Sequence, residues 1–245
     1  MDKLPPPELK QVLSRSETLL DSKMYVKAVI HGRWGVGKTT FAADAPNPYW
    51  IDFERSSDTL RKMESMAQTK ILRPKTVKEV WDVVKVAEHI CETLVFDTVT
   101  SFQIFYMREY MREEEATSKR NRDKYDVYMG DYKYATAELT DFFLQLQEAP
   151  VNVIFCAHSI DIMSKPKDQN DSPQLVSIQP EITPKVWAHL AAFINVVGYL
   201  EKVRTITGNV ERRLYLNETN VIKAKNRLGI QEDFIKQPTY KGIFT

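Results

Sequence analysis

One short stretch, residues 32–40, constrains the fold of this chain more than any other feature. It reads Gly-Arg-Trp-Gly-Val-Gly-Lys-Thr-Thr and fits the pattern G-x-x-x-x-G-K-[ST], which is typical of a phosphate-binding P-loop. The small glycines let backbone N–H groups turn inward onto phosphate oxygens, and the helix after such a loop directs its positive dipole end at the same anion. The motif therefore predicts a nucleoside triphosphate site. The alternative is a glycine-rich turn that binds nothing.

The segments on either side of this loop match what the motif requires. Residues Tyr25–Ile30 form an apolar run typical of a buried strand, and Thr39–Ala43 begins as a helix would. We expect the Lys38 ammonium to contact the β- and γ-phosphates of ATP, as part of the catalytic set, and the Thr39 hydroxyl to bind Mg²⁺. The expected nucleotide-binding residues are Gly32, Arg33, Trp34, Gly35, Val36, Gly37, Lys38, Thr39 and Thr40.

Apolar runs alternate with amphipathic segments after the loop, which predicts an α/β fold with a mostly parallel sheet between helices. The expected strands here are Tyr49–Phe53, Ile71-Leu72, Thr93–Val99 and Val151–Ala157. The expected helices are Asp58–Met66, Val77–Ile90, Ser101–Glu115, Glu138–Gln147 and Pro184–Phe193. From Val196 onward the pattern changes to short strands, which predict an antiparallel extension at one edge of the sheet. Those strands are expected at 196–204, 212–216 and 221–225.

Length and local composition set the domain organisation. At 245 residues the chain is long enough for one α/β domain with a full core. We divide it into an N-terminal arm, residues 1–23, a core that contains the P-loop, residues 24–230, and a C-terminal tail, residues 231–245. A short amphipathic helix is expected in the arm. Two interpretations of that helix stay open. In one it packs on its own domain, and in the other it docks on a neighbouring subunit.

Charge and hydropathy exclude some classes of protein. The 34 basic and 33 acidic residues nearly cancel, so contact with nucleic acid would have to come from a local basic patch. No run of about 18 apolar residues could span a membrane, and the N-terminus lacks the apolar core of a signal peptide. Cys91 and Cys156 are typical of free thiols in a reducing compartment. We therefore expect a cytoplasmic protein without a membrane partner.

Two acidic residues complete the expected ATP site. Asp97 follows the apolar residues 94–96, which is the Walker B pattern in which a strand next to the P-loop places a carboxylate near Mg²⁺. The alternative role for Asp97 is a helix cap. Because Thr98 rather than an acid follows Asp97, we expect Glu54, at the end of another strand, to polarise the attacking water as general base. The alternative for Glu54 is a surface glutamate.

Further candidate catalytic residues lie later in the chain. His158 ends a predicted strand, where it would sense the γ-phosphate and relay that state into the next loop. The alternative is a hydrogen-bonded histidine at a strand end. Alternation along a strand would place Lys223, Lys225 and Arg227 on one face. We expect Lys225 and Arg227 to reach their own γ-phosphate or, as an arginine finger, that of a neighbouring subunit. The alternative is a solvated basic face.

The order of these motifs resembles the RecA-like ATPase core. The features that carry the resemblance are the P-loop, Glu54 after the second strand, Asp97, the strand-end His158, and the late Lys225 and Arg227. More narrowly, the chain resembles small phage-encoded nucleotide-binding proteins, some of which act in single-strand annealing recombination. The resemblance covers about residues 24–230. The chain departs from the family because no N-terminal polymerisation motif and no separate helicase or DNA-binding domain can be assigned.

The resemblance implies a Mg²⁺-dependent ATPase that forms a homo-oligomeric ring or filament with shared ATP sites. It also implies single-stranded DNA as a ligand in recombination or replication, and a single-strand-binding protein as a further partner. For a phage-encoded chain the location would be the host cytoplasm. Two other functions stay open. One is a DNA-annealing or loading module in which ATP is mainly a structural ligand, and the other is a P-loop kinase for a small substrate.

Two polar intervals, about 116–133 and 159–183, interrupt the predicted elements, and the second has almost no periodicity. In RecA-like assemblies two loops at matching places line the path of the DNA. Basic residues interleaved with aromatic ones suit a single strand, because cations meet phosphates and rings stack on bases. The alternative is that Tyr128, Tyr132 and Tyr134 pack under the first loop. The candidate nucleic-acid residues are Lys119, Arg120, Arg122, Lys124, Tyr125, Tyr128, Lys133, Lys165 and Lys167.

Overall fold

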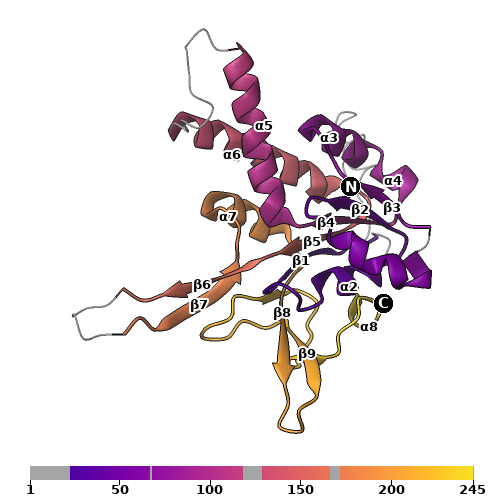
Figure 1. Cartoon of the computed structure of the whole chain (residues 1–245), viewed down its shortest axis with the longest axis vertical. Coiled ribbons are helices and arrows are strands. Elements are labelled where there is room, and N and C mark those ends of the chain that lie inside the picture. The colour runs from indigo at the N-terminus through magenta and orange to yellow at the C-terminus, as the bar shows by residue number, and fades with distance from the viewer. Residues whose placement is uncertain (1–22, 67, 118–128, 166–171, 245) are drawn as a thin grey trace, which may run out of the picture.

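The computed structural model describes residues 23–66, 68–117, 129–165 and 172–244. Within these ranges nine strands form one sheet in the order β11-β9-β8-β1-β5-β4-β2-β3, with β10 paired to β8 (Figure 1). The strands are β1 Lys27–His31, β2 Pro48–Asp52, β3 Lys70–Leu72, β4 Thr93–Asp97, β5 Asn152–Ala157, β8 Val196–Arg204, β9 Val210–Tyr215, β10 Lys225–Asn226 and β11 Ile235–Lys236.

The direction of the strands divides the sheet into two parts. From β3 to β8 all neighbours pair in parallel, whereas β9, β10 and β11 pair antiparallel. The predicted mostly parallel sheet with an antiparallel C-terminal extension is therefore confirmed. The P-loop follows β1 and Asp97 ends β4, and β5 lies between these two strands. The Walker B strand is thus one strand removed from the P-loop strand rather than its direct neighbour.

Helices cover both faces of the sheet. They are α2 Lys38–Ala43, α3 Val77–Lys85, α4 Ala87–Ile90, α5 Val99–Thr117, α6 Met129–Glu148, α7 Pro184–Phe193 and α8 Lys241–Phe244, with 3₁₀ turns η1 Ser56–Lys62 and η2 Glu64–Met66. Neighbouring residues of a strand point to opposite faces, so two cores form. On one face Phe96 of β4 packs with Phe102 of α5 and Phe142 of α6. On the other face Val95 packs in the cluster that contains Phe41 of α2.

The second polar interval is not the featureless loop that the sequence predicts. It contains strands β6 Ser159–Met163 and β7 Leu175–Pro180, which pair antiparallel and project from the body of the molecule (Figure 1). The prediction failed because these strands have no continuous buried run. Ile160 is exposed and Ile162 half-buried, so backbone hydrogen bonds rather than core burial hold the hairpin.

The first polar interval is shorter than predicted, because α5 continues to Thr117 and α6 already begins at Met129. Lys133 therefore lies on a helix rather than in a loop. Tyr132 and Tyr134 are 54% and 61% exposed, so the alternative in which these two rings pack under the loop is wrong. The third tyrosine of that alternative, Tyr128, lies outside the described residues.

The C-terminal third differs from expectation in two places. The strand predicted at 221–225 is reduced to β10, and Ile222 forms only an isolated bridge with Ile178. The tail packs on the core through its described residues, because β11 extends the sheet and Tyr240 is 2% exposed against Phe41 and Phe244. All of the predicted N-terminal arm except Lys23 lies outside the described residues.

Candidate active site

The P-loop leaves β1 at the carboxyl edge of the sheet and turns into α2. Gly37, the last residue before the helix, has a φ of 109°, a conformation that favours glycine. Gly32 is needed for a different reason, because a Cβ there would lie 2.2 Å from the Leu200 carbonyl oxygen. These two positions explain why the motif glycines hold the backbone as a cradle for phosphate oxygens.

Lys38 is held inside the cradle. Its side chain is buried, and Nζ donates to the carbonyl oxygens of Gly32 at 2.9 Å and Arg33 at 3.1 Å. Burial lowers the pKa of this ammonium, and the carboxylates of Asp97 and Glu54 act in the opposite direction. A phosphate oxygen is a stronger partner for an ammonium than a carbonyl oxygen is. A bound phosphate would therefore compete with these two carbonyl oxygens for Lys38.

Oxygen ligands for a metal ion meet beside Lys38. The Thr39 hydroxyl donates to Asp97 Oδ2 at 2.9 Å, and the Ser56 hydroxyl donates to the same oxygen at 2.6 Å. Asp97 is 1% exposed, and burial raises its pKa although both hydroxyls lower it. Hard hydroxyl and carboxylate oxygens are the ligands that Mg²⁺ takes, so Thr39 and Asp97 fit the ion that the P-loop requires. Ser56 was not predicted.

Glu54 and His158, predicted separately, are brought into contact. His158 Nε2 lies 3.0 Å from Glu54 Oε1, and the hydroxyls of Thr98 and Ser101 each donate to that oxygen at 2.5 Å. Burial raises the pKa of Glu54, but the hydrogen bonds from His158, Ser101 and Thr98 outweigh it and lower the pKa to about 2. Glu54 is thus an ionised, positioned carboxylate rather than the surface glutamate of the alternative interpretation.

The P-loop itself contacts this pair through Trp34. Its ring centroid lies 5.4 Å from that of His158, although 80% of Trp34 is exposed. Among the described residues, Nδ1 of His158 is buried without a hydrogen-bond partner. The histidine therefore touches the general-base candidate on one side and the phosphate loop on the other.

Two buried polar residues that the sequence did not reveal support the site. The Asp52 carboxylate accepts the backbone N–H groups of Glu54, Ser56 and Ser57 and fixes the turn that carries Glu54. His31, directly before the P-loop, accepts from the Ser159 hydroxyl and donates to the Lys223 carbonyl. Burial lowers the pKa of His31 to about 4, so its ring is neutral at pH 7. The only sequence signal for either residue is its position at the end of a predicted strand.

The late basic cluster lies at the opposite edge of the sheet. Lys225 Nζ donates to the Ala191 carbonyl at 2.5 Å, and Arg227 donates to that of Ala192 at 2.8 Å, at the end of α7. Asn195 joins this region to Lys27 at the start of β1, and a five-residue strand separates that point from the P-loop by about 13 Å. Lys225 and Arg227 therefore do not reach the P-loop of their own chain.

The prediction that Lys223 shares a face with Lys225 and Arg227 is wrong for Lys223, whereas the other two side chains both reach carbonyl oxygens at the end of α7. Only Lys225 and Asn226 are in a strand, and the Lys223 ammonium instead pairs with Glu218 at 2.6 Å. Strand alternation does not apply to Lys223 because its backbone leaves the ladder. Of the candidate nucleic-acid residues, Lys133 and Lys165 are exposed. The others lie outside the described residues, namely Lys119, Arg120, Arg122, Lys124, Tyr125, Tyr128 and Lys167.

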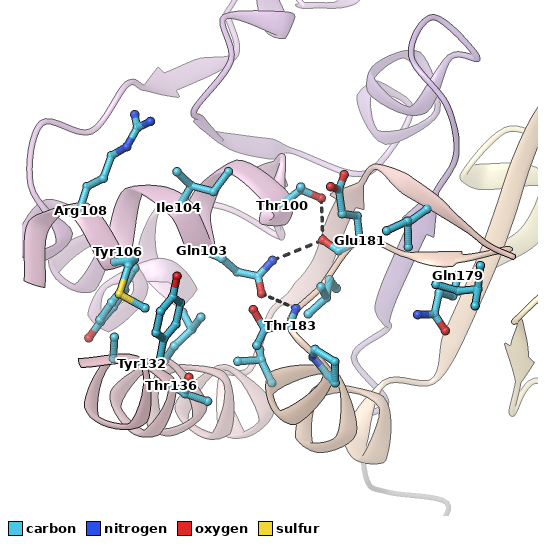
Figure 2. A pocket seen from close by; sticks show the side chains of 18 residues that line it. Thr100, Gln103, Ile104, Tyr106, Arg108, Tyr132, Thr136, Gln179, Glu181 and Thr183 are labelled. Atoms are coloured by element: carbon cyan, nitrogen blue, oxygen red, sulfur yellow. Dashed lines mark hydrogen bonds between the residues drawn. The ribbon is translucent and has the colours of Figure 1, made fainter. Parts of the chain in front are cut away.

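A pocket of about 600 Å³ lies between α5, α6, the β6–β7 hairpin and the start of α7 (Figure 2). Most of its lining surface is apolar, and the lining includes Ile104 of α5 and Tyr132 of α6. Thr100, in its wall, donates to the Glu181 carbonyl at 3.2 Å and accepts from the His158 backbone N–H at 3.0 Å. One hydroxyl thus connects the pocket wall to the residue that holds Glu54.

The chain is similar to known proteins in sequence and in fold. The model of a family described as AAA domain matches residues 24–228. Flagellar accessory protein FlaH from Methanocaldococcus jannaschii is 12% identical with a TM-score of 0.42, over 88% of this chain and 87% of that chain. The RadB recombinase is 15% identical with a TM-score of 0.47, over 86% of each chain. No curated protein matches the sequence.

Within the described residues, none of the helices has both the length and the apolar character that crossing a bilayer requires.

Proposed function

Because the chain belongs to the AAA domain family, and is thus a P-loop ATPase in general terms, we propose a more specific function. It is a Mg²⁺-dependent ATPase with a RecA-like core, whose copies assemble into a ring or filament and bind single-stranded DNA. The setting we propose is phage-type recombination by strand annealing, or replication. The observation that carries the proposal is the contact between Glu54 and His158 beside Asp97.

This geometry supports hydrolysis. Asp97 of β4 pairs in register with Asp52 of β2, so Glu54 lies just beyond the metal-binding carboxylate. Bound Mg²⁺ would neutralise phosphate charge. Glu54 orients a water whose oxygen forms a bond to the γ-phosphorus while the bond to the β,γ-bridging oxygen breaks. The products are ADP and phosphate, and the released proton passes to solvent because a carboxylate of pKa about 2 does not retain it.

The pocket beside α6 supports contact with a single strand. Tyr132 lines it and is half-exposed, and Lys133 is exposed on the same helix. A base stacked on Tyr132 with its phosphate near Lys133 would press on the wall that contains Thr100. Because Thr100 bonds the His158 backbone, strand binding would then change the position of Glu54 and couple DNA to hydrolysis.

The place of Arg227 supports assembly. Its guanidinium is exposed at the amino edge of the sheet beside a pocket that Lys23 and Lys27 also line. The Lys225 and Arg227 side chains, which are too far from their own P-loop, suit the triphosphate of a neighbouring copy. Hydrolysis would then need two copies, with Lys225 and Arg227 of one acting on the ATP of the other.

The test is hydrolysis per protomer as protein concentration rises, with and without single-stranded DNA. We expect specific activity to rise with concentration and again with DNA, and to collapse in Arg227→Ala. Arg204→Ala, which removes an exposed arginine from the end of β8, is the matched control and should behave as wild type. Activity that is flat with concentration and unaffected by DNA or Arg227→Ala would refute the shared site. Transfer of phosphate to a small acceptor would replace this function by a kinase.

Two substitutions on α6, one of them a control, test DNA binding. Tyr132→Ala should weaken single-strand binding about tenfold or more, because a stacked base contributes ~1–3 kcal/mol. Tyr134→Ala, exposed on the same helix but outside the pocket lining, should change it little. Equal effects of the two substitutions would contradict a role for the pocket.

A second function, a DNA-annealing or loading module with slow turnover, has one observation in its favour. The pKa of Glu54, about 2, makes its carboxylate a weak proton acceptor, and efficient general bases have a pKa near the working pH. Normal DNA annealing by a protein with ATP bound, without measurable hydrolysis, would favour this alternative.

A further inference from the structure

Arg212 of β9 lies against the P-loop, although it is 172 residues beyond the end of the motif in the sequence. Its Nε donates to the Val36 carbonyl at 2.9 Å. A Cβ built on Gly37 would lie 2.7 Å from Arg212 Nε, so the guanidinium rests directly on the loop residue that precedes Lys38. The absence of a side chain at Gly37 is what allows this approach.

The backbone of β9 holds Arg212 in place from both sides. Arg212 pairs with Lys202 of β8, and its carbonyl oxygen accepts the Gln237 N–H at 2.9 Å beside β11. Its neighbour Arg213 points to the other face, where it pairs with Glu211 at 2.7 Å and covers the Phe234 ring. The two adjacent arginines are therefore used differently, one in a surface ion pair and one on the P-loop.

The charge of Arg212 has no partner in the described part of the chain. No carboxylate lies within ion-pair distance of it there, and its terminal nitrogens make no hydrogen bond to a described residue. Arg33, the arginine within the P-loop itself, is paired with Asp161 at 2.5 Å. A half-buried guanidinium that has no counter-ion among the described residues, next to a loop shaped for anions, fits a phosphate.

We propose that Arg212 is a ligand of the nucleotide's phosphate chain, supplied by the same chain as the P-loop. This inference rests on the proposed function to the extent that the P-loop binds ATP. Together with Lys38 it provides a second fixed cation for Mg-ATP, which remains an anion after the metal is counted. The Nε contact to Val36 aims the guanidinium, so that its two terminal nitrogens are left for phosphate oxygens.

The test is equilibrium binding of Mg-ATP and of Mg-tripolyphosphate, which lacks the nucleoside, without DNA. Arg212→Ala should weaken both ligands by a similar factor of about ten- to a hundredfold, the range for hydrogen bonds to a charged group. Arg204→Ala, which removes the same charge from the far end of the β8–β9 hairpin, should leave both affinities unchanged. Lys38→Ala is the reference for loss of the site.

Arg212→Gln separates the charge of Arg212 from its hydrogen bond to the Val36 carbonyl. Glutamine keeps an N–H donor for the Val36 carbonyl but has no charge, so affinity should stay low, whereas Arg212→Lys should recover part of it. Full recovery in Arg212→Gln, or a loss confined to ATP with tripolyphosphate unaffected, would overturn the phosphate contact. Thermal unfolding without nucleotide checks that each variant folds. If Arg212→Ala does not fold, the comparison between Arg212→Lys and Arg212→Gln is the test.

The outcomes also separate this inference from the proposed function. If the wild type binds Mg-ATP, Lys38→Ala does not bind it and Arg212→Ala binds it with wild-type affinity, the inference alone is refuted. Wild type that binds neither ligand would refute both.

Discussion

Glu54→Gln is the substitution that most directly examines the active site, because it keeps the shape of the side chain and removes its charge. We expect ATP turnover to fall about 10²–10⁴-fold, the contribution of a positioned acid–base group. Nucleotide affinity should change little, since the hydrogen bonds of the Glu54 side chain go to Thr98, Ser101 and His158, none of which is in the P-loop.

The structure also predicts an effect on stability. Lowering the Glu54 pKa from 4.5 to about 2 corresponds to at most about 3 kcal/mol at neutral pH. Because 26% of the side chain is exposed, solvent screening reduces this to about 1 kcal/mol. Glu54→Gln should therefore lower the free energy of unfolding by about 1 kcal/mol at pH 7.

The sign of the pH dependence follows from the depressed pKa. The folded state binds a proton at Glu54 less readily than the unfolded state, so the stabilisation is present above pH about 4.5 and is lost as the pH falls toward 2. The difference between wild type and Glu54→Gln should shrink to less than half of its pH 7 value by about pH 3.

Urea unfolding at pH 7 and pH 3, with hydrolysis measured in parallel, provides the assay. The exposed Glu232→Gln is the matched control and should show neither effect. A stability difference that is equal at both pH values would refute the hydrogen-bonded carboxylate as its cause. Wild-type turnover in Glu54→Gln would refute the role of Glu54 in orienting the attacking water.

Three further substitutions examine the core, the tail and the coupling. Phe102→Ala should cost about 3–5 kcal/mol in urea unfolding, because the ring is fully buried among Phe53, Phe96 and Phe142; a loss below about 1 kcal/mol would contradict that packing. Tyr240→Ala should lower the free energy of unfolding of the whole domain by a similar amount, in a single transition. A separate transition at lower urea would show that the tail detaches by itself. Thr100→Val should reduce DNA-stimulated hydrolysis more than basal hydrolysis, and equal losses would contradict its role as a link.

Contiguous features of this protein were readable from the sequence because their geometry is local. The P-loop residues from Gly32 to Thr40 are consecutive, so the turn that presents their backbone N–H groups is encoded in one short stretch of sequence. The strand-end residues Glu54, Asp97 and His158 were readable for a related reason. Each follows a buried apolar run, and the ends of such runs in a parallel sheet lie at one edge.

Which of these residues touch one another was decided by the order of the strands. Glu54 and His158 are 104 residues apart, and they meet because β4 alone separates β2 from β5. A hydrophobic pattern identifies a strand but not its neighbours, since every buried strand of the sheet has a similar apolar run. For the same reason the sequence could not show that Lys225 and Arg227 lie at the edge opposite the P-loop.

Arg212 and the β6–β7 hairpin mark the limit of sequence reasoning most clearly. Arg212 lies beside Arg213 in a row of charged residues, and only the pairing of β9 with β8 directs one of the two onto Gly37. The hairpin has no buried run to announce it, because its ladder forms outside the core. The sequence by itself determined the phosphate loop and the class of fold, where local backbone geometry and burial act. Tertiary structure alone decided which distant charges share the site, because strand pairing is a long-range choice.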